Sequence, residues 1–319
     1  MHCRKRKPKS ASVADLSKPT TVAALCDLIA SRLAGAVDDP MGEARELLAG
    51  LHDAPRSWVS VHANDPPIEL LIDAAMDATA KRAAGAPLAY AVGRAAFRHL
   101  FLHVDERVLI PRPETEELVT LALRYVRSGC TVVDVGTGSG AIALALATES
   151  AAARVIGTDL SAGAIEVAEL NARAVLRREY ARTEFLPGNL LDPVDDDQID
   201  VIVSNPPYIA LGEGADLPSA VRDWEPALAL FGGHDGMGVI RDLIVQAEAR
   251  LADGGMLLLE IDARRGREAL ALVAEPRWRD AQLLPDAFGR DRFLIVRRSA
   301  LGAVAGQPSS AAATPTGTH

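Results

Sequence analysis

The sequence predicts an α/β protein in which a mostly parallel sheet carries helices on both faces and follows a small N-terminal helical bundle. From Cys130 to about residue 298, short apolar runs alternate with segments of helical period. Such alternation is typical of a parallel sheet with crossover helices. Before residue 92, apolar residues keep helical spacing alone, so this region is expected to form a separate bundle.

Bulk properties limit the classes of protein to which the chain can belong. Its 319 residues suffice for two domains, and 49% of them are hydrophobic. A formal net charge of −9 makes the body a poor generic nucleic-acid binder. Cys3, Cys26 and Cys130 show no metal spacing and fit a reducing compartment. The sequence lacks a signal peptide and an apolar run of about 18 residues, so we expect a cytoplasmic protein without membrane contact.

The first 91 residues divide into a basic tail and three expected helices. Residues 1–18 are expected to be disordered, and contact of this tail with nucleic acid or the ribosome is the less favoured alternative. Thr20-Thr21 offers N-caps for a first helix, Asp38-Asp39-Pro40 opens a second, and Asp65-Pro66-Pro67 opens a third. Residues 19–91 are therefore expected to form a helical domain that either caps the fold or recognises a partner.

The elements of the second domain follow from a change of period. Residues 92–110 alternate in part, which predicts one or two short strands as a hairpin or linker; Phe97 there either walls a substrate channel or packs in the core. Residues 111–298 open with a helix at Pro113. The further expected helices are Gly140–Thr148, Ala162–Val175 and Met237–Leu251. The expected strands are Thr131–Val135, Arg154–Thr158, Glu184–Leu186, Ile199–Ser204, Met256–Ile261, Gln282–Leu284 and Arg292–Val296. Residues 299–319 are expected to be disordered.

The fourth expected strand stops abruptly at Asn205, Pro206, Pro207 and Tyr208. Proline fixes φ and has no N–H, and Pro206 pushes Asn205 out of the α region, so the carbonyl groups of Asn205 and Pro206 are free to project. Together with the Asn205 amide oxygen and the flat Tyr208 ring, they make a rigid acceptor site for a planar –NH2 group. The alternative is a proline-rich turn without a binding role.

A glycine loop follows the first expected strand, and it consists of Gly136, Thr137, Gly138, Ser139 and Gly140. Its glycines allow close approach of the backbone to a ligand. Asp134, just before the loop, is expected to face a cationic or amine-bearing group. Asp159 ends the next strand, where a carboxylate accepts hydrogen bonds from two ribose hydroxyl groups. The loop, Asp159 and Asn205 all lie at C-terminal strand ends, where open α/β sheets bind ligands.

This combination resembles the class I S-adenosylmethionine-dependent methyltransferases and, more closely, the release factor glutamine methyltransferases, also called the HemK-like family. The segments that carry the resemblance are Arg82–Phe97, Val108–Glu116, Asp134–Gly140, Ser204–Ile209, Glu225–Leu230, Asp235-Gly236 and Gly289–Arg292. The resemblance implies a Rossmann-like class I methyltransferase sheet whose last strand is antiparallel, preceded by a helical domain for substrate recognition. Three positions depart from the family pattern: Asn189 stands where an acid is usual, Asp262 where Gly is usual and Arg265 where Gln is frequent.

The resemblance also implies a cofactor, a substrate and roles for individual residues. S-adenosyl-L-methionine would be bound by Asp134, the loop of residues 136–140, Asp159, Asn189, Leu190 and Asn205. The partner would be a peptide chain release factor, methylated on the glutamine side chain of its Gly-Gly-Gln motif. Asn205, Pro206, Pro207 and Tyr208 would bind this amide, and Asn205, Pro206 and Tyr208 would act in catalysis. No metal and no direct nucleic-acid binding are expected, and we expect a monomer.

Other functions and roles stay open at this stage. The chain is also compatible with a glutamine methyltransferase of a ribosomal protein, with an amino-methyltransferase of adenine or guanine in nucleic acid, and with a non-catalytic cofactor-binding protein. Arg112 either forms a structural salt bridge or orients Glu114 or the hinge between the domains. Glu225 either shapes the acceptor pocket or has a simple loop role.

Overall fold

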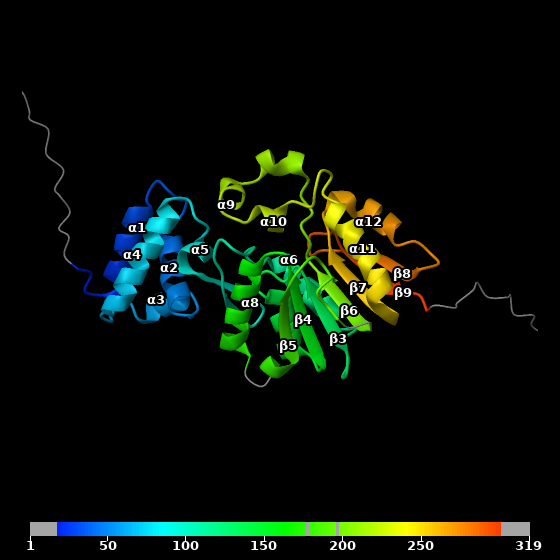
Figure 1. Ribbon diagram of the computed structural model, residues 1–319. Helices are drawn as coiled ribbons and strands as arrows, with labels where there is room; N and C mark the ends of the chain where they lie inside the picture. Colours follow the sequence, from blue (N-terminus) through cyan, green and yellow to red (C-terminus); the bar gives the residue numbers. More distant parts are fainter. Residues whose placement is uncertain (1–17, 177–178, 196–197, 301–319) are drawn as a thin grey trace, which may run out of the picture. The chain divides into compact units, whose positions relative to one another are not determined.

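The computed structural model describes residues 18–176, 179–195 and 198–300. The chain divides after Val92 into two compact units (Figure 1). The two tails expected to be disordered fall almost entirely outside the described residues. Across the described ranges, no helix combines the length and the apolar character that a membrane span requires.

The described part of the first unit is helical. Its helices are α1 (Val22–Leu33), α2 (Pro40–Leu51), α3 (Ser57–Val61), α4 (Glu69–Ala83) and α5 (Leu88–Val92). Thr21 caps α1, because its hydroxyl oxygen accepts a hydrogen bond from the Ala24 amide at 3.1 Å. Asp39 caps α2 in the same way through the Gly42 amide. The sequence predicted α1, α2 and α4 but not α3 and α5, since helices of five residues are too short to show a period.

The second unit begins with a hairpin that packs on a helix of the same unit. β1 (Arg94–Phe97) and β2 (Leu100–His103) pair antiparallel, as the alternating apolar residues predict. The Asn171 side chain on α8 (Ala162–Val175) accepts a hydrogen bond from the His103 amide and donates to the carbonyl groups of His103 and Ser139. This one amide therefore connects the hairpin to the glycine loop. Phe97 is completely buried in the core, so core packing is the outcome for this residue.

The described residues of the second unit form a seven-stranded sheet with the order β5-β4-β3-β6-β7-β9-β8. Its strands are β3 (Thr131–Val135), β4 (Arg154–Asp159), β5 (Thr183–Pro187), β6 (Ile199–Ser204), β7 (Leu251–Glu260), β8 (Trp278–Pro285) and β9 (Asp291–Arg298). The first five are parallel, and β9 runs antiparallel to both β7 and β8. This confirms the predicted fold class, including the antiparallel last strand.

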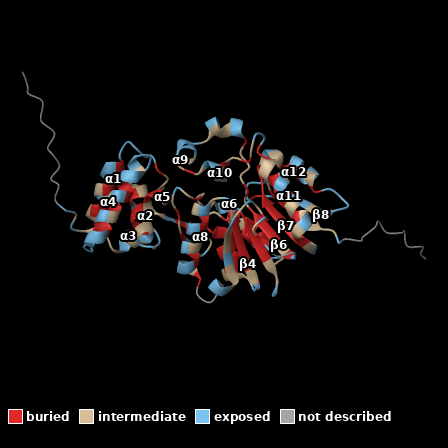
Figure 2. Cartoon of the chain, viewed as in Figure 1, coloured by how far each residue is buried: buried red, intermediate tan, exposed pale blue. Residues whose placement is uncertain are grey.

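Helices cover both faces of the sheet (Figure 1). Successive strand residues point to opposite faces, and in the central strands most residues on both faces are apolar and buried. Val201 and Val203 pack with α6 (Pro113–Ala122), α7 (Ala141–Glu149) and the end of α8. Ile202, between them, packs with α11 (Gly238–Arg250) and α12 (Gly266–Leu272) on the other face. The central strands are buried on both faces, as Figure 2 shows. This explains their nearly continuous apolar sequences.

Short helical segments complete the second unit. They are η1 (Glu179–Arg182), η2 (Leu211–Asp216), α9 (Ser219–Arg222), α10 (Ala227–Leu230) and η3 (Ala263–Arg265). Of these, η2, α9 and α10 follow β6 and separate it from α11. The sequence did not predict them, because each has too few residues to show a period.

The strand order reverses between β3 and β6. The chain runs from β3 outward to β4 and β5, and then returns to place β6 on the opposite side of β3. Open α/β sheets bind ligands at such a reversal, beyond the carboxyl ends of the strands. The glycine loop after β3 and Asn205 after β6 both lie at this point.

Candidate active site

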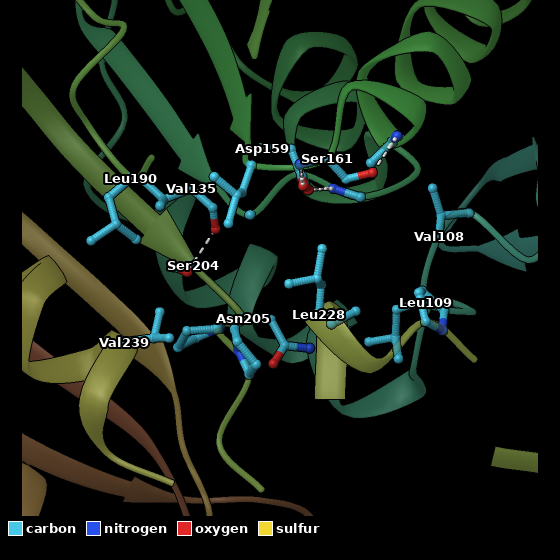
Figure 3. Close-up of a pocket in the computed structure, with 18 of the residues that line it drawn as sticks. Val108, Leu109, Val135, Asp159, Ser161, Leu190, Ser204, Asn205, Leu228 and Val239 are labelled. Carbon is cyan, nitrogen blue, oxygen red and sulfur yellow. Dashed lines mark hydrogen bonds between the residues drawn. The ribbon is translucent and has the colours of Figure 1, made fainter. Parts of the chain in front are cut away.

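A cavity opens at the strand reversal and brings together residues from seven segments of the second unit (Figure 3). Asp159 and Ser161 lie on one side of it, and Asn205 and Leu228 lie on the other. The residues singled out in the sequence that line this cavity are Gly136, Gly138, Asp159, Asn189, Leu190, Asn205, Pro206 and Pro207. The predicted cofactor and acceptor motifs therefore share one cavity.

The glycine loop presents bare backbone to the cavity. Gly136 and Gly138 have φ values of +72° and +54°, which a side chain would strain. A Cβ atom added at either position would meet no other atom within 4 Å, so the space above both is open. Because glycine has no side chain, a ligand can approach the backbone at Gly136 and Gly138 more closely than it could at a residue with a Cβ atom.

Asp159 is held rigidly beside the loop. Its Oδ2 atom accepts a hydrogen bond from the Gly138 amide and its Oδ1 atom accepts one from the Ser161 amide, both at 2.9 Å. Each carboxylate oxygen has a second lone pair for another donor. Burial raises the pKa of Asp159, and the two backbone amides oppose this rise. A carboxylate fixed in this way fits a pair of ligand hydroxyl groups.

Four of the residues predicted to bind the cofactor lie outside the cavity wall. Asp134 is completely buried, and its Oδ2 atom accepts hydrogen bonds from the Thr137 hydroxyl at 2.7 Å and the Ala143 amide at 3.1 Å. Burial raises its pKa to about 7. Thr137 and Ser139 are also buried, and a Cβ atom on Gly140 would crowd Leu144 and Ala168. The structure thus places Asp134 beneath the loop as its support, and not facing a ligand as the sequence suggested.

The segment after β6 presents acceptors to the cavity through three of its four residues. Asn205, Pro206 and Pro207 line the wall, whereas Tyr208 does not belong to it. The Tyr208 hydroxyl group instead donates a hydrogen bond to Glu260 Oε1 at 3.3 Å. Burial raises the pKa of Tyr208, and the Glu260 charge adds to this effect. The expected stacking of the Tyr208 ring over the substrate amide is therefore not supported by this arrangement.

A buried hydrogen-bonded chain, which no sequence motif indicated, lies behind Asn205. Asn205 Nδ2 donates to the Thr115 hydroxyl oxygen at 3.0 Å, and the Thr115 hydroxyl donates to Glu260 Oε2 at 2.7 Å. Thr115 and Glu260 are 4% and 1% exposed. They come from α6 and the end of β7, so only the folded chain brings them together.

A second buried pair holds the outer wall of the cavity. The Arg112 guanidinium donates from Nη2 to both carboxylate oxygens of Glu225 at 2.7 Å, and the Glu225 side chain is 1% exposed. Glu225 directly precedes Pro226, Leu228 and Ala229, which line the cavity. Of the alternatives for Arg112, the structure supports the salt bridge, and the salt bridge positions this wall.

Two of the three departures from the family pattern contact each other. Arg265 Nη1 lies 2.7 Å from Asp262 Oδ2, and Arg265 Nη2 lies 2.9 Å from Glu213 Oε1. Arg265 also donates to the carbonyl group of Asp235. The pair therefore connects η2, the loop before α11 and η3. The third departure, Asn189, lines the cavity beside Leu190.

The chemistry available in this cavity is binding and orientation. It offers a carboxylate at one side, amide and carbonyl oxygens at the other, and apolar walls that include Val108, Leu109 and Leu228. No cysteine or histidine is among its lining residues. Nowhere in the described ranges do three or more His, Cys, Asp or Glu side chains gather as metal ligands would.

Comparisons with known proteins find similar sequences and structures. A family model described as the methyltransferase small domain matches residues 117–217, and a model described as the PrmC N-terminal domain matches residues 24–93. Among solved structures, a methyltransferase from Pyrococcus furiosus is similar at 18% identity with a TM-score of 0.49, over 65% of this chain and 92% of that chain.

Full-length relatives are more similar. A release factor glutamine methyltransferase from Moorella thermoacetica is 39% identical over 86% of this chain and 98% of its own length. Proteins of the same name from Cereibacter sphaeroides and Streptomyces coelicolor are 40% and 39% identical, over 83% and 84% of this chain and 94% and 95% of their own lengths.

Proposed function

The chain belongs to the release factor glutamine methyltransferase family, and from this premise we propose that it methylates a peptide chain release factor. The methyl group passes from S-adenosyl-L-methionine to the side-chain amide nitrogen of the glutamine in the Gly-Gly-Gln motif. The observation that best supports this proposal is the shared cavity, in which Asp159 and the open glycine loop face Asn205 and Pro206. S-adenosyl-L-methionine on the Asp159 side can then lie beside the glutamine side chain on the Asn205 side.

The residues on the Asp159 side fit S-adenosyl-L-methionine. Asp159 accepts the ribose hydroxyl groups with its remaining lone pairs, and Gly136 and Gly138 leave room for the ligand against the backbone. Asn189 and Leu190 bind the adenine base, where Asn189 offers hydrogen-bonding groups without a charge. Asp134 acts indirectly by holding Thr137 and the first turn of α7. When bound, the cofactor supplies an electrophilic methyl group.

The residues on the Asn205 side make a weak nucleophile reactive. The lone pair of an amide nitrogen is delocalised, and the nitrogen becomes positively charged as the methyl group is transferred. The Asn205 side-chain oxygen and the Pro206 carbonyl accept hydrogen bonds from the two N–H groups and stabilise this charge. Fixing the nitrogen in line with the methyl group contributes up to about 7–11 kcal/mol in the best intramolecular models. The nitrogen then releases one proton, and a neutral N-methyl amide results.

The first unit is proposed to recognise the protein substrate. Its match to a family N-terminal domain supports a role shared with the relatives, and the cavity lies within the second unit alone. We further propose that the enzyme works in the cytoplasm as a monomer and does not bind nucleic acid directly, which its net charge of −9 favours.

Methyl transfer assays on purified acceptors test the proposed function. The full-length chain is incubated with S-adenosyl-L-methionine labelled in the methyl group and, in separate reactions, with release factor, ribosomal proteins or DNA. The expected result is rapid labelling of the release factor, with labelling of ribosomal proteins and DNA at background level. Preferred labelling of ribosomal protein or DNA would establish one of the alternative acceptors instead.

A further inference from the structure

The side-chain amide of Asn205 has two possible orientations, and only one of them suits an acceptor. With its oxygen atom toward the cavity, Asn205 accepts a hydrogen bond from a substrate N–H group. With its NH2 group toward the cavity, Asn205 places N–H donors against the N–H donors of the substrate amide, and the two groups repel each other. The two orientations have nearly the same shape, so packing alone does not select between them.

The partner behind Asn205 selects the orientation by hydrogen-bond direction. The Thr115 hydroxyl group has one hydrogen atom to donate, and its Oγ1 atom lies 2.7 Å from Glu260 Oε2. An ionised carboxylate only accepts hydrogen bonds, so the Thr115 hydrogen atom must point to Glu260. The Thr115 oxygen can then only accept from Asn205, and Asn205 Nδ2 lies 3.0 Å from it.

We propose that Glu260, acting through the hydroxyl group of Thr115, holds the Asn205 amide with its oxygen atom toward the cavity, and that Thr115 and Glu260 are positioning residues for methyl transfer. This inference rests on the proposed function and assigns a task to residues that the acceptor motif itself does not contain. In the structure, the Asn205 amide oxygen accepts no hydrogen bond from the described residues, which leaves it available to a substrate. The second oxygen of Glu260 receives the Tyr208 hydroxyl group, so one carboxylate holds both ends of the acceptor motif.

The protonation state of Glu260 gives the proposal a distinct consequence. Burial raises the pKa of Glu260, while hydrogen bonds from Thr115 and Tyr208 and the charge of Arg292 lower it; Glu114 adds to the rise. A protonated Glu260 can donate to Thr115, and Thr115 can then donate to Asn205, which turns the amide. Transfer should therefore slow as the pH falls through the pKa of Glu260, and recover as the carboxylate forms.

The test compares variants of the full-length chain on release factor in single turnover, with donor and release factor saturating. Thr115→Val removes the hydroxyl group at nearly constant volume, and we expect a rate about 10- to 100-fold lower, since small misplacements of reacting groups cost this much. Thr115→Ser restores most of the rate. Thr120→Val, on the exposed face of the same helix, is the matched control and keeps the wild-type rate. Donor affinity by calorimetry stays unchanged in all of them.

A double-mutant cycle separates positioning from a general effect on the fold. If Thr115 acts through Asn205, Thr115→Val should change the rate less than about 2-fold when Asn205 is already alanine. Glu260→Gln, which can donate to Thr115, should lower the rate and abolish its acid limb. Equal effects of Thr115→Val in both backgrounds, or a wild-type rate in Thr115→Val, would overturn the inference. If the wild-type chain leaves release factor unlabelled, the proposed function fails instead, so the two failures are distinguishable.

Discussion

Removal of the Arg112 guanidinium should destabilise the second unit in a pH-dependent way. The Glu225 side chain is 1% exposed, and both its oxygens lie 2.7 Å from Arg112 Nη2. Leaving one charge of a buried pair without its partner costs about 3–5 kcal/mol. Because the Arg112 side chain is itself 32% exposed, water can partly replace it, so we expect about 2–3 kcal/mol for Arg112→Met. For a unit of roughly 150–250 residues, such as the second unit, that lowers Tm by roughly 4–12 °C.

The sign of the pH dependence follows from the raised pKa of Glu225. Burial raises this pKa above its ordinary value, and Arg112 opposes the rise, so the loss of Arg112 raises it further. The folded variant then binds a proton more tightly than the unfolded chain, for which the pKa is about 4.3. Its stability is highest below that value and decreases as the pH rises through the folded-state pKa. The stability deficit relative to wild type should therefore be small near pH 4 and full at pH 7.

Thermal unfolding at several pH values, followed by circular dichroism, measures this effect. The double variant Arg112→Met/Glu225→Gln removes the unpaired charge and should recover at least half of the lost Tm at pH 7. Since Glu225 precedes the cavity wall formed by Pro226 and Leu228, Arg112→Met should also slow methyl transfer. An unchanged Tm at pH 7, or a deficit that is equal at all pH values, would refute the assignment of a charged buried pair.

The remaining predictions concern the cavity and the departures from the family pattern. Asp159→Ala should weaken S-adenosyl-L-methionine binding about 10- to 100-fold in calorimetry, because a hydrogen bond to a charged group contributes roughly 1.5–3 kcal/mol; unchanged affinity would remove Asp159 from the site. Asn205→Ala should lower turnover by about 10²–10³ while the donor affinity stays close to wild type, and a turnover within 3-fold of wild type would exclude its role. Asp262→Gly should lower the free energy of unfolding in chemical denaturation, because it leaves Arg265 without one of its carboxylate partners. The double variant Asp262→Gly/Arg265→Gln should be closer in stability to wild type. If the stability losses of the two substitutions add up, the two departures are independent.

The motifs predicted from the sequence line one cavity because they follow parallel strands directly. Asn205 directly follows β6 and Asp159 ends β4, and the carboxyl ends of parallel strands necessarily lie at one edge of the sheet. The sequence-based prediction that Asp134 faces a ligand did not take into account the alternation of side chains along its strand. Strand residues alternate between faces, so Asp134 lies on the opposite side from Val133 and Val135, under α7.

Other parts of the site depend on contacts that no local pattern encodes. The Thr115–Glu260 hydrogen bond joins residues 145 positions apart, and the Arg112–Glu225 pair joins residues 113 positions apart. The direction of the Tyr208 side chain could not be predicted from the sequence either, because it depends on the hydrogen bond to Glu260 on β7. The motif predicted the types of residue at the acceptor site, and the tertiary fold decides which of them reach the cavity.

Site-resolved mass spectrometry of purified release factor identifies the atom that the enzyme methylates. The full-length chain is incubated with S-adenosyl-L-methionine and either release factor or its variant in which the Gly-Gly-Gln glutamine is replaced by alanine. We expect one added methyl group on the side-chain nitrogen of that glutamine and none on the variant. Equal methylation of the alanine variant, or a methyl group at any other residue of the parent protein, would contradict it.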